Sequence, residues 1–154
     1  MGDVVLENPF KLLIKHLKIA TKKDDQNSWI VEINANVNNL MVSKKIEFNT
    51  IWIQTTLDQN TSNEIFLVSD ETGKAKITNC KAAAAIDMNW TKGMYCNVIG
   101  TLVRVKGIPE IQAQQIIPIC EKERITLLKR IWPIEVQDSH LFLLDVMHPN
   151  LNED

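Results

Sequence analysis

The chain of 154 residues lacks the long apolar runs of a membrane protein and the paired cysteines of a disulfide-rich fold. No stretch approaches the roughly 20 uncharged residues that a spanning helix needs. The sequence does not begin with basic residues followed by an apolar run, so it predicts no signal peptide. The three cysteines, Cys80, Cys96 and Cys120, are widely separated and form no CxxC pair. We therefore expect reduced thiols inside a cell and no zinc site.

An excess of positive charge is also missing. The 17 Lys and Arg residues stand against 19 Asp and Glu residues, which gives a net charge of −2. A protein that binds phosphate backbones over a large surface normally carries a clear surplus of Lys and Arg. The charge balance argues against a nucleic-acid-binding surface that covers much of the molecule, but it does not exclude a local basic patch.

Catalytic and nucleotide-binding signatures are absent as well, including GxxxxGK[ST], GxGxxG, HExxH and GxSxG. His16, His140 and His148 lack a metal-ligand spacing, and we expect them to be surface residues. The carboxylate pairs Asp24-Asp25 and Asp70-Glu71 fall in predicted turns, where such residues serve the backbone. The sequence therefore predicts neither an enzyme nor a bound cofactor or metal.

The N-terminal segment predicts a helix over about residues 9–20. Pro9 suits the first helical position, and Asn8 suits the cap before it. The apolar residues of its face recur at helical spacing and are Phe10, Leu13, Ile14 and Leu17. Lys11 lies on a stripe of lysines beside this face. That stripe is either a solvated flank or a basic edge that meets an acidic partner.

The middle of the chain alternates between apolar and polar residues, which predicts strands. A first strand from Trp29 to Ala35 ends at a turn signal, Asn38-Asn39. The later segments with a strand pattern are 46–58, 64–70, 74–80, 94–105 and 110–119. The alanine-rich segment 81–89 predicts a short helix between the third and fourth of these. Gly100 in the fourth marks a bend or a bulge.

Three strands, a short helix and two more strands in this order are typical of an OB-fold barrel. We therefore predict a single, mainly β domain over residues 1–154, with a five-stranded OB-fold barrel over about residues 46–119. The N-terminal helix precedes the barrel, and a C-terminal helical segment over about 121–147 follows it. Pro133 interrupts that segment and would suit the first position of a second helix.

The C-terminal segment carries an apolar stripe that must pack against something. Its members are Trp132, Val136, Leu143 and Met147, broadened by Leu144 and, at the margin, His140. The barrel can cover part of this stripe, and a partner helix can cover the rest.

OB-fold barrels bind oligonucleotides, oligosaccharides or proteins. Binding to single-stranded DNA needs exposed aromatic residues on the central strands and a basic groove. The second and third barrel strands supply Phe66 as their only aromatic residue. Protein binding is therefore the favoured function. The alternative is a single-stranded DNA-binding protein similar to a small subunit of replication protein A.

Alternate residues of a strand point to the same face, so Trp52 shares a face with Thr50, Gln54 and Thr56. That face is otherwise polar. An indole on such a face suggests an interface contact, because tryptophan is enriched among interface hot spots. A bend in the strand could instead turn it into the core. We favour the interface slightly and leave both possibilities open.

Several segments resemble, in order, the second subunit of the RecQ-mediated genome instability heterodimer. They are Phe10-Lys11-Leu12-Leu13, Ile51-Trp52-Ile53-Gln54, Val68-Ser69-Asp70-Glu71-Thr72-Gly73, Lys92-Gly93-Met94-Tyr95-Cys96-Asn97-Val98-Ile99-Gly100, and Ile131-Trp132-Pro133-Ile134-Glu135-Val136-Gln137-Asp138-Ser139-His140. The last is the most specific, since it matches the family's Met-Trp-x-x-Glu-Val-x-Asp-x-His segment at fixed spacing.

The resemblance implies a nuclear adaptor without enzymatic activity. Members of this family pair tightly with the second OB domain of the first subunit through the C-terminal helix, in a contact that resembles the one between replication protein A subunits. The pair joins topoisomerase III alpha and a Bloom-type RecQ helicase and helps to dissolve double Holliday junctions. No direct binding to nucleic acid or membrane is expected. The predicted interface residues are Lys11, Trp52, Trp132, Val136, His140 and Leu143.

Overall fold

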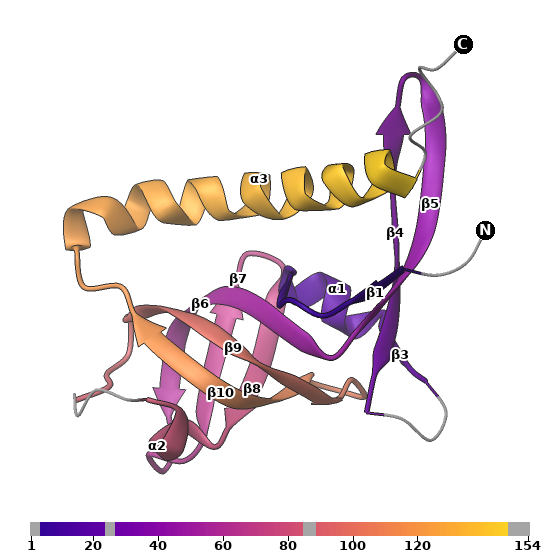
Figure 1. Ribbon diagram of the computed structural model, residues 1–154. Coiled ribbons are helices and arrows are strands. Elements are labelled where there is room, and N and C mark those ends of the chain that lie inside the picture. Colours follow the sequence, from indigo (N-terminus) through magenta and orange to yellow (C-terminus); the bar gives the residue numbers. More distant parts are fainter. Residues whose placement is uncertain (1–3, 24–26, 85–88, 148–154) are drawn as a thin grey trace.

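The computed structural model describes residues 4–23, 27–84 and 89–147 as two β-sheets crossed by one long helix (Figure 1). The strands are β1 (Val4–Leu6), β2 (Phe10–Lys11), β3 (Thr21–Lys22), β4 (Trp29–Val37), β5 (Leu40–Phe48), β6 (Thr50–Asn60), β7 (Phe66–Asp70), β8 (Gly73–Thr78), β9 (Tyr95–Arg104) and β10 (Glu110–Pro118). The helices are α1 (Ile14–Lys18), α2 (Cys80–Ala83) and α3 (Lys122–Met147).

Strands β6 to β10 form the predicted OB-fold barrel. The sheet order is β2-β6-β7-β8-β10-β9, and an additional pairing of β6 with β9 closes it. Strand β8 runs parallel to β10, and the other pairs of barrel strands are antiparallel. Alternate side chains fill the barrel, among them the fully buried Ile53, Val68, Ile77 and Ile111. The mainly β fold class is confirmed. The barrel itself begins at Thr50, because residues 46–48 belong to β5 of the other sheet.

The predicted bend at Gly100 is a close approach between neighbouring strands. A Cβ atom at this position would lie 2.3 Å from the carbonyl oxygen of Gln112 on β10. The register between β9 and β10 shifts between Ala113 and Gln115, one residue further along. Glycine is therefore required at this position because the two backbones nearly touch.

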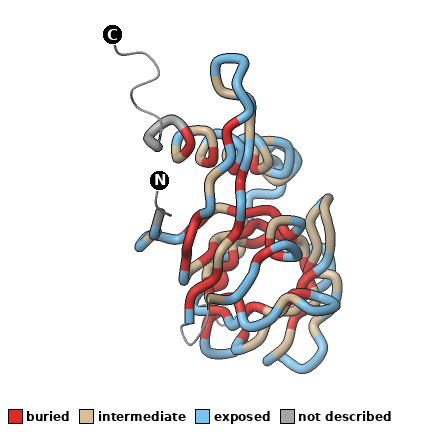
Figure 2. Tube along the Cα trace, turned by 90° about the vertical axis from the view of Figure 1, so that its right-hand side faces the viewer, coloured by how far each residue is buried: buried red, intermediate tan, exposed pale blue. Residues whose placement is uncertain are grey.

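The second sheet has the order β1-β5-β4-β3 and is dominated by the β4–β5 hairpin. Nine residue pairs join these two strands, from Trp29 with Phe48 to Val37 with Leu40. Asn38 and Asn39 have φ values of 54° and 66°, which confirms the predicted turn. The distal half of the hairpin projects beyond the barrel, and its tip is exposed (Figure 2).

The predicted helix over residues 9–20 is shorter than expected. Phe10 and Lys11 pair with Ile51 and Trp52 as a parallel strand, and α1 begins only at Ile14. The reason is a distant cap, since the backbone N–H groups of Ile14 and Lys15 donate to side chains of the β7–β8 hairpin. The predicted helix over 81–89 is also shorter, because α2 ends at Ala83, and residues 85–88 lie outside the described part of the chain.

The C-terminal segment is one continuous helix, and the predicted break at Pro133 is wrong. A proline inside a helix removes one backbone hydrogen bond and costs about 3 kcal/mol. Trp132 and Val136, on either side of Pro133, are buried against the rest of the chain and hold the helix in place there. Among the described residues, neither α3 nor a shorter helix has the apolar length that a bilayer-spanning helix requires.

Candidate protein-interaction site

The inner side of α3 packs on a small apolar cluster outside the barrel interior. Trp132 and Val136 lie against Leu13, which precedes α1, and against Trp52 of β6. The rings of Trp52 and Trp132 are 5.5 Å apart. The indole N–H of Trp52 donates to Asn97 Oδ1 on β9 at 2.8 Å. The cluster therefore fixes the height and direction of α3 above the barrel.

Lys11 closes the exposed edge of this cluster. Its ammonium nitrogen lies 4.9 Å from the ring centre of Trp52 and 5.9 Å from that of Trp132. The same nitrogen is 3.6 Å from Glu135 Oε2 on α3. A cation over an aromatic face contributes about 0.5–2 kcal/mol, depending on its desolvation. Lys11 therefore links β2, β6 and α3 through one partly exposed side chain.

The indole nitrogen of Trp132 has no hydrogen-bond partner among the described residues, although it is fully buried. Leaving a buried donor unpaired costs about 1–3 kcal/mol. Trp132 is therefore held by its ring contacts rather than by a polar anchor.

Two histidines join α1 to α3, which corrects the expectation that they lie on the surface. The rings of His16 and His140 are 5.0 Å apart, and His140 is buried. His140 Nε2 lies 2.9 Å from the carbonyl oxygen of Lys11 and must donate to it, while His16 Nδ1 accepts from the N–H of Leu13. Burial, with the nearby His140 and Lys15, lowers the pKa of His16 to about 4. Burial also lowers the pKa of His140, and the hydrogen bond to Lys11 opposes that shift. His148 lies outside the described residues.

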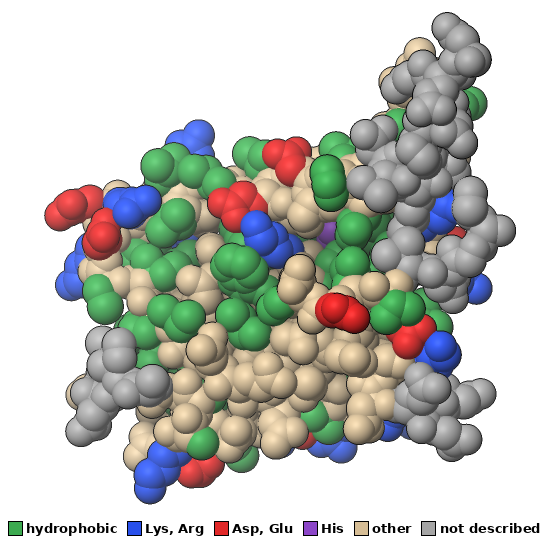
Figure 3. Space-filling model, in the orientation of Figure 1, with side chains coloured by type: hydrophobic (Ala, Val, Ile, Leu, Met, Phe, Trp, Pro, Cys, Tyr) green, Lys and Arg blue, Asp and Glu red, His purple; other side chains and the backbone are tan. Residues whose placement is uncertain are grey.

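The outer side of α3 exposes three large apolar side chains together with the charged Asp138. Leu127, Ile134 and Phe142 are 53%, 55% and 67% exposed, and their spacing of seven and eight residues places them on one side of the helix. In the space-filling view, hydrophobic side chains gather along α3 and just beneath it, whereas the lower front of the barrel is mostly uncharged and polar (Figure 3). We call these three residues the outer stripe of α3.

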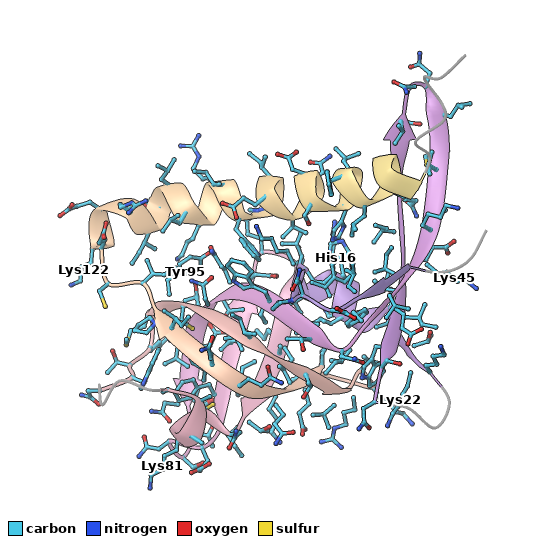
Figure 4. The ribbon with its side chains drawn as sticks, viewed as in Figure 1. His16, Lys22, Lys45, Lys81, Tyr95 and Lys122 are labelled. Carbon is cyan, nitrogen blue, oxygen red and sulfur yellow. The ribbon has the colours of Figure 1, made fainter. Side chains whose placement is uncertain are left out.

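A cavity of about 530 Å³ opens between α3 and the end of the barrel. Tyr95 lies in it beneath the N-terminal half of α3, and its hydroxyl donates to Gln54 Oε1 at 3.0 Å (Figure 4). Lysines and acidic residues line the cavity in equal number: Lys15, Lys129, Asp70 and Glu71. No group of three or more His, Cys, Asp or Glu side chains suited to a metal ion occurs among the described residues.

The oligonucleotide-binding face that OB-folds usually offer corresponds here to the outer side of β7 and β8. It presents Leu67, Lys74 and Lys76, and Lys76 pairs with Glu110 at 3.8 Å. Phe66, the one aromatic residue on these strands, points into the barrel and is 2% exposed. The face therefore has no aromatic residue on which a base could stack.

The structure brings the six predicted interface residues together. Four of them belong to the C-terminal two thirds of α3, and Lys11 and Trp52 lie on β2 and β6 next to that helix. Within the single chain, Trp132, Val136 and His140 are buried, whereas Lys11, Trp52 and Leu143 are partly exposed. The side chain of Met147 is outside the described residues. The outer stripe was not predicted, because the sequence analysis considered one apolar side of the C-terminal helix and not a second. The apolar residues on its opposite side, visible in the sequence, were the available signal.

Comparisons with known proteins agree with this architecture. One chain of a replication protein A heterotrimer bound to single-stranded DNA has a TM-score of 0.58 at 13% identity, over 87% of this chain and 98% of its own length. A chain of the S. pombe Stn1–Ten1 complex has a TM-score of 0.50 at 10% identity, over 85% of this chain and 94% of its own. At such identities the likeness shows the fold alone.

No curated protein sequence matches the chain. The model of one protein family does, and it covers residues 8–140. That match includes the barrel, the β4–β5 hairpin and most of α3, so it extends over most of the chain. The chain is therefore a member of the RecQ-mediated genome instability protein 2 family.

Proposed function

We propose that the chain is a non-enzymatic adaptor subunit that pairs with the first subunit of the RecQ-mediated genome instability heterodimer. Through that subunit it supports topoisomerase III alpha and a Bloom-type RecQ helicase in the nucleus, where the complex dissolves double Holliday junctions. Family membership supports this role. The lack of a stacking platform on the β7–β8 face favours it over the alternative of a single-stranded DNA-binding protein.

The single observation that carries the proposal is the outer stripe of α3. A helix normally buries one apolar side and leaves a polar side in water. Here the inner side already covers the barrel through Trp132 and Val136, and yet Leu127, Ile134 and Phe142 remain exposed on the other side. Exposed apolar surface of this kind marks a protein contact. An apolar helix face of the first subunit fits it best.

The six predicted residues take two roles in this proposal. Lys11 and Trp52 are partly exposed beside Glu135 of α3, where a partner on this helix would reach the rim of the contact. Leu143 lies on the inner side of α3 and packs against the core. Trp132, Val136 and His140 act by holding α3 at a fixed position on the barrel. A rigid, preorganised helix binds more tightly because less conformational entropy is lost on association.

The test is the variant Ile134→Glu, co-expressed with the tagged first subunit of the same source. A charge in the middle of the apolar contact should weaken capture by at least about tenfold, the effect of losing a hot-spot side chain. Thermal unfolding of the isolated chain should change little, because Ile134 is exposed.

The matched control is Thr126→Glu, which puts the same charge at another exposed position of α3, roughly 100° around the helix from Leu127. Capture of this variant should equal that of the unmodified chain. Normal capture of a folded Ile134→Glu variant would remove the outer stripe from the interface.

A further inference from the structure

The distal β4–β5 hairpin has one open backbone edge that the proposed pairing through α3 does not use. Strand β3 covers β4 only at Trp29 and Ile30. No described strand pairs with that side of β4 from Val31 to Val37. The end of the hairpin projects beyond α3 (Figures 1 and 2), and Glu32, Asn34 and Asn36 are exposed, whereas α3 contacts another part of β4.

The hairpin register shows which backbone groups face this edge. A two-residue turn at Asn38-Asn39 makes Val37 and Leu40 a hydrogen-bonded pair. Hydrogen-bonded and non-hydrogen-bonded pairs alternate from there, so the N–H and C=O groups of Glu32, Asn34 and Asn36 point away from β5. The same alternation holds just before β4 begins, where the backbone carbonyl of Ser28 points away from β5 and accepts a hydrogen bond from the backbone N–H of Lys23 at 3.0 Å.

A groove lies directly against this edge. Its cavity of about 350 Å³ is bounded by Asn34 and Ala35 of β4, by Lys15 and His16 of α1, and by the side of α3 that carries Gln137. His16, on α1, lies beneath α3 (Figure 4). An extended segment paired with β4 would therefore have space for the side chains that point away from the sheet.

The charges distinguish this edge from the opposite one. Edge strands are usually protected by charged residues, above all lysine. Strand β5 carries Lys44 and Lys45, whereas β4 carries one charged side chain, Glu32, and none from Ile33 to Val37. Lys15 is the one charged residue that lines the groove, and its ammonium makes no ion pair among the described residues. The groove thus offers unpaired backbone groups beside a single positive charge.

We propose that the free edge of β4 accepts an extended, acidic segment of another protein, which adds to the sheet as a strand in line with β3. Backbone groups of Glu32, Asn34 and Asn36 supply the hydrogen bonds, and Lys15 pairs with a carboxylate of the segment. Main-chain pairing gives affinity in this mode of recognition, and side-chain pockets give selectivity.

The test uses blocked octapeptides that alternate valine and serine, with one glutamate moved through every position, and a parallel set with lysine. Amide hydrogen exchange of the full chain is the readout. The best glutamate peptide should slow exchange at Glu32, Asn34 and Asn36 by about tenfold or more, and the corresponding lysine peptide should bind about fivefold more weakly.

Two proline variants form a matched pair, because Asn34 and Ser43 lie opposite each other in the hairpin. Asn34→Pro removes an N–H from the open edge of β4, and Ser43→Pro removes one from the opposite edge. Peptide binding should fall by about tenfold or more in Asn34→Pro and persist in Ser43→Pro. Lys15→Glu should reverse the preference from glutamate to lysine peptides.

The proposal fails if no peptide slows these three amides, or if protection falls on Met41, Ser43 and Lys45 instead. It also fails if the three amides are protected without peptide. Protection that increases with protein concentration would then identify a second copy of the chain, and constant protection a segment of the chain itself. Capture of the first subunit should be unchanged in Asn34→Pro, so this test and that of the outer stripe fail independently.

Discussion

The carboxylate of Asp70 shows how one residue joins two distant parts of the chain. Its Oδ1 atom accepts hydrogen bonds from the backbone N–H and the hydroxyl of Thr72 and from the N–H of Gly73. Its Oδ2 atom accepts from the N–H of Ile14, 56 residues away, at 2.9 Å. Asp70 therefore shapes the β7–β8 turn and caps α1. The hairpin motif that resembles the family has this physical basis.

We expect Asp70→Ala to lower the free energy of unfolding by about 2–3 kcal/mol, because it removes a helix cap and several hydrogen bonds to a charged acceptor. Urea unfolding monitored by circular dichroism measures this loss. Glu71→Ala is the control, since Glu71 is exposed and adjacent, and it should stay within about 0.5 kcal/mol of the unmodified chain. Equal effects of the two substitutions would show that Asp70 is not a cap.

At the residue scale the sequence identified the right side chains but not their mutual contacts. Trp52 was recognised as unusual because its strand phase is polar. Its position between Lys11 and Trp132 could not be predicted, because these residues come from three elements far apart in the chain. The structure gives Trp52 an intermediate place, packed on its own chain along one side and partly exposed along the other. A local sequence pattern can predict that a side chain makes a contact, but it seldom predicts which residue the side chain contacts.

At the scale of elements, the predictions succeeded where pairing is local. The alternation from Trp29 and the Asn38-Asn39 turn gave β4 and the tip of the hairpin correctly. The first half of β5 was not predicted, because Leu40 and Met41 are adjacent apolar residues and do not alternate with polar ones. The N-terminal helix was predicted too long because Phe10 and Lys11 join β6 instead. Tertiary pairing overrode the helical spacing there.

We expect the junction of α1 and α3 to make stability depend on pH. His16 and His140 are neutral when buried, and the pKa of His16 falls from 6.5 to about 4. Between those values the unfolded chain binds more protons than the folded one. Stability should therefore be complete above pH 6.5 and decline as the pH falls toward 4. Urea midpoints measured from pH 7 to pH 5 test this, above the range in which most carboxylates titrate.

The control for that measurement is the double variant His16→Gln, His140→Gln, which keeps polar side chains but cannot titrate. Its midpoint should start lower, because the ring contact and the packing are lost, and should change less between pH 7 and pH 5. Parallel curves for the two proteins would show that the histidines do not link α1 and α3 to pH.

At the scale of the whole molecule, charge and shape separate the two functions that an OB-fold barrel suggests. The net charge is −2, and Lys76 of the β7–β8 face forms an ion pair with Glu110. All four tryptophans are buried or half-buried within the chain, and Phe66 fills the barrel. Exposed apolar side chains occur on α3, at Leu127, Ile134 and Phe142, whereas none occurs on β7 or β8. The shape of the barrel is shared with single-stranded DNA-binding proteins, but its surface is not.

We therefore expect the isolated chain to bind a labelled single-stranded oligonucleotide only weakly, with a Kd above about 1 µM at physiological salt, in the range of non-specific contacts. Stacking contributes about 1–3 kcal/mol per base in true single-strand binders, and this face has no ring to supply it. Fluorescence anisotropy over a series of salt concentrations measures both affinity and salt dependence. The variant Lys74→Glu, Lys76→Glu shows whether any binding uses the β7–β8 face. Submicromolar binding with a steep salt slope that this variant abolishes would favour the DNA-binding function over the adaptor, whatever the outer stripe of α3 contacts.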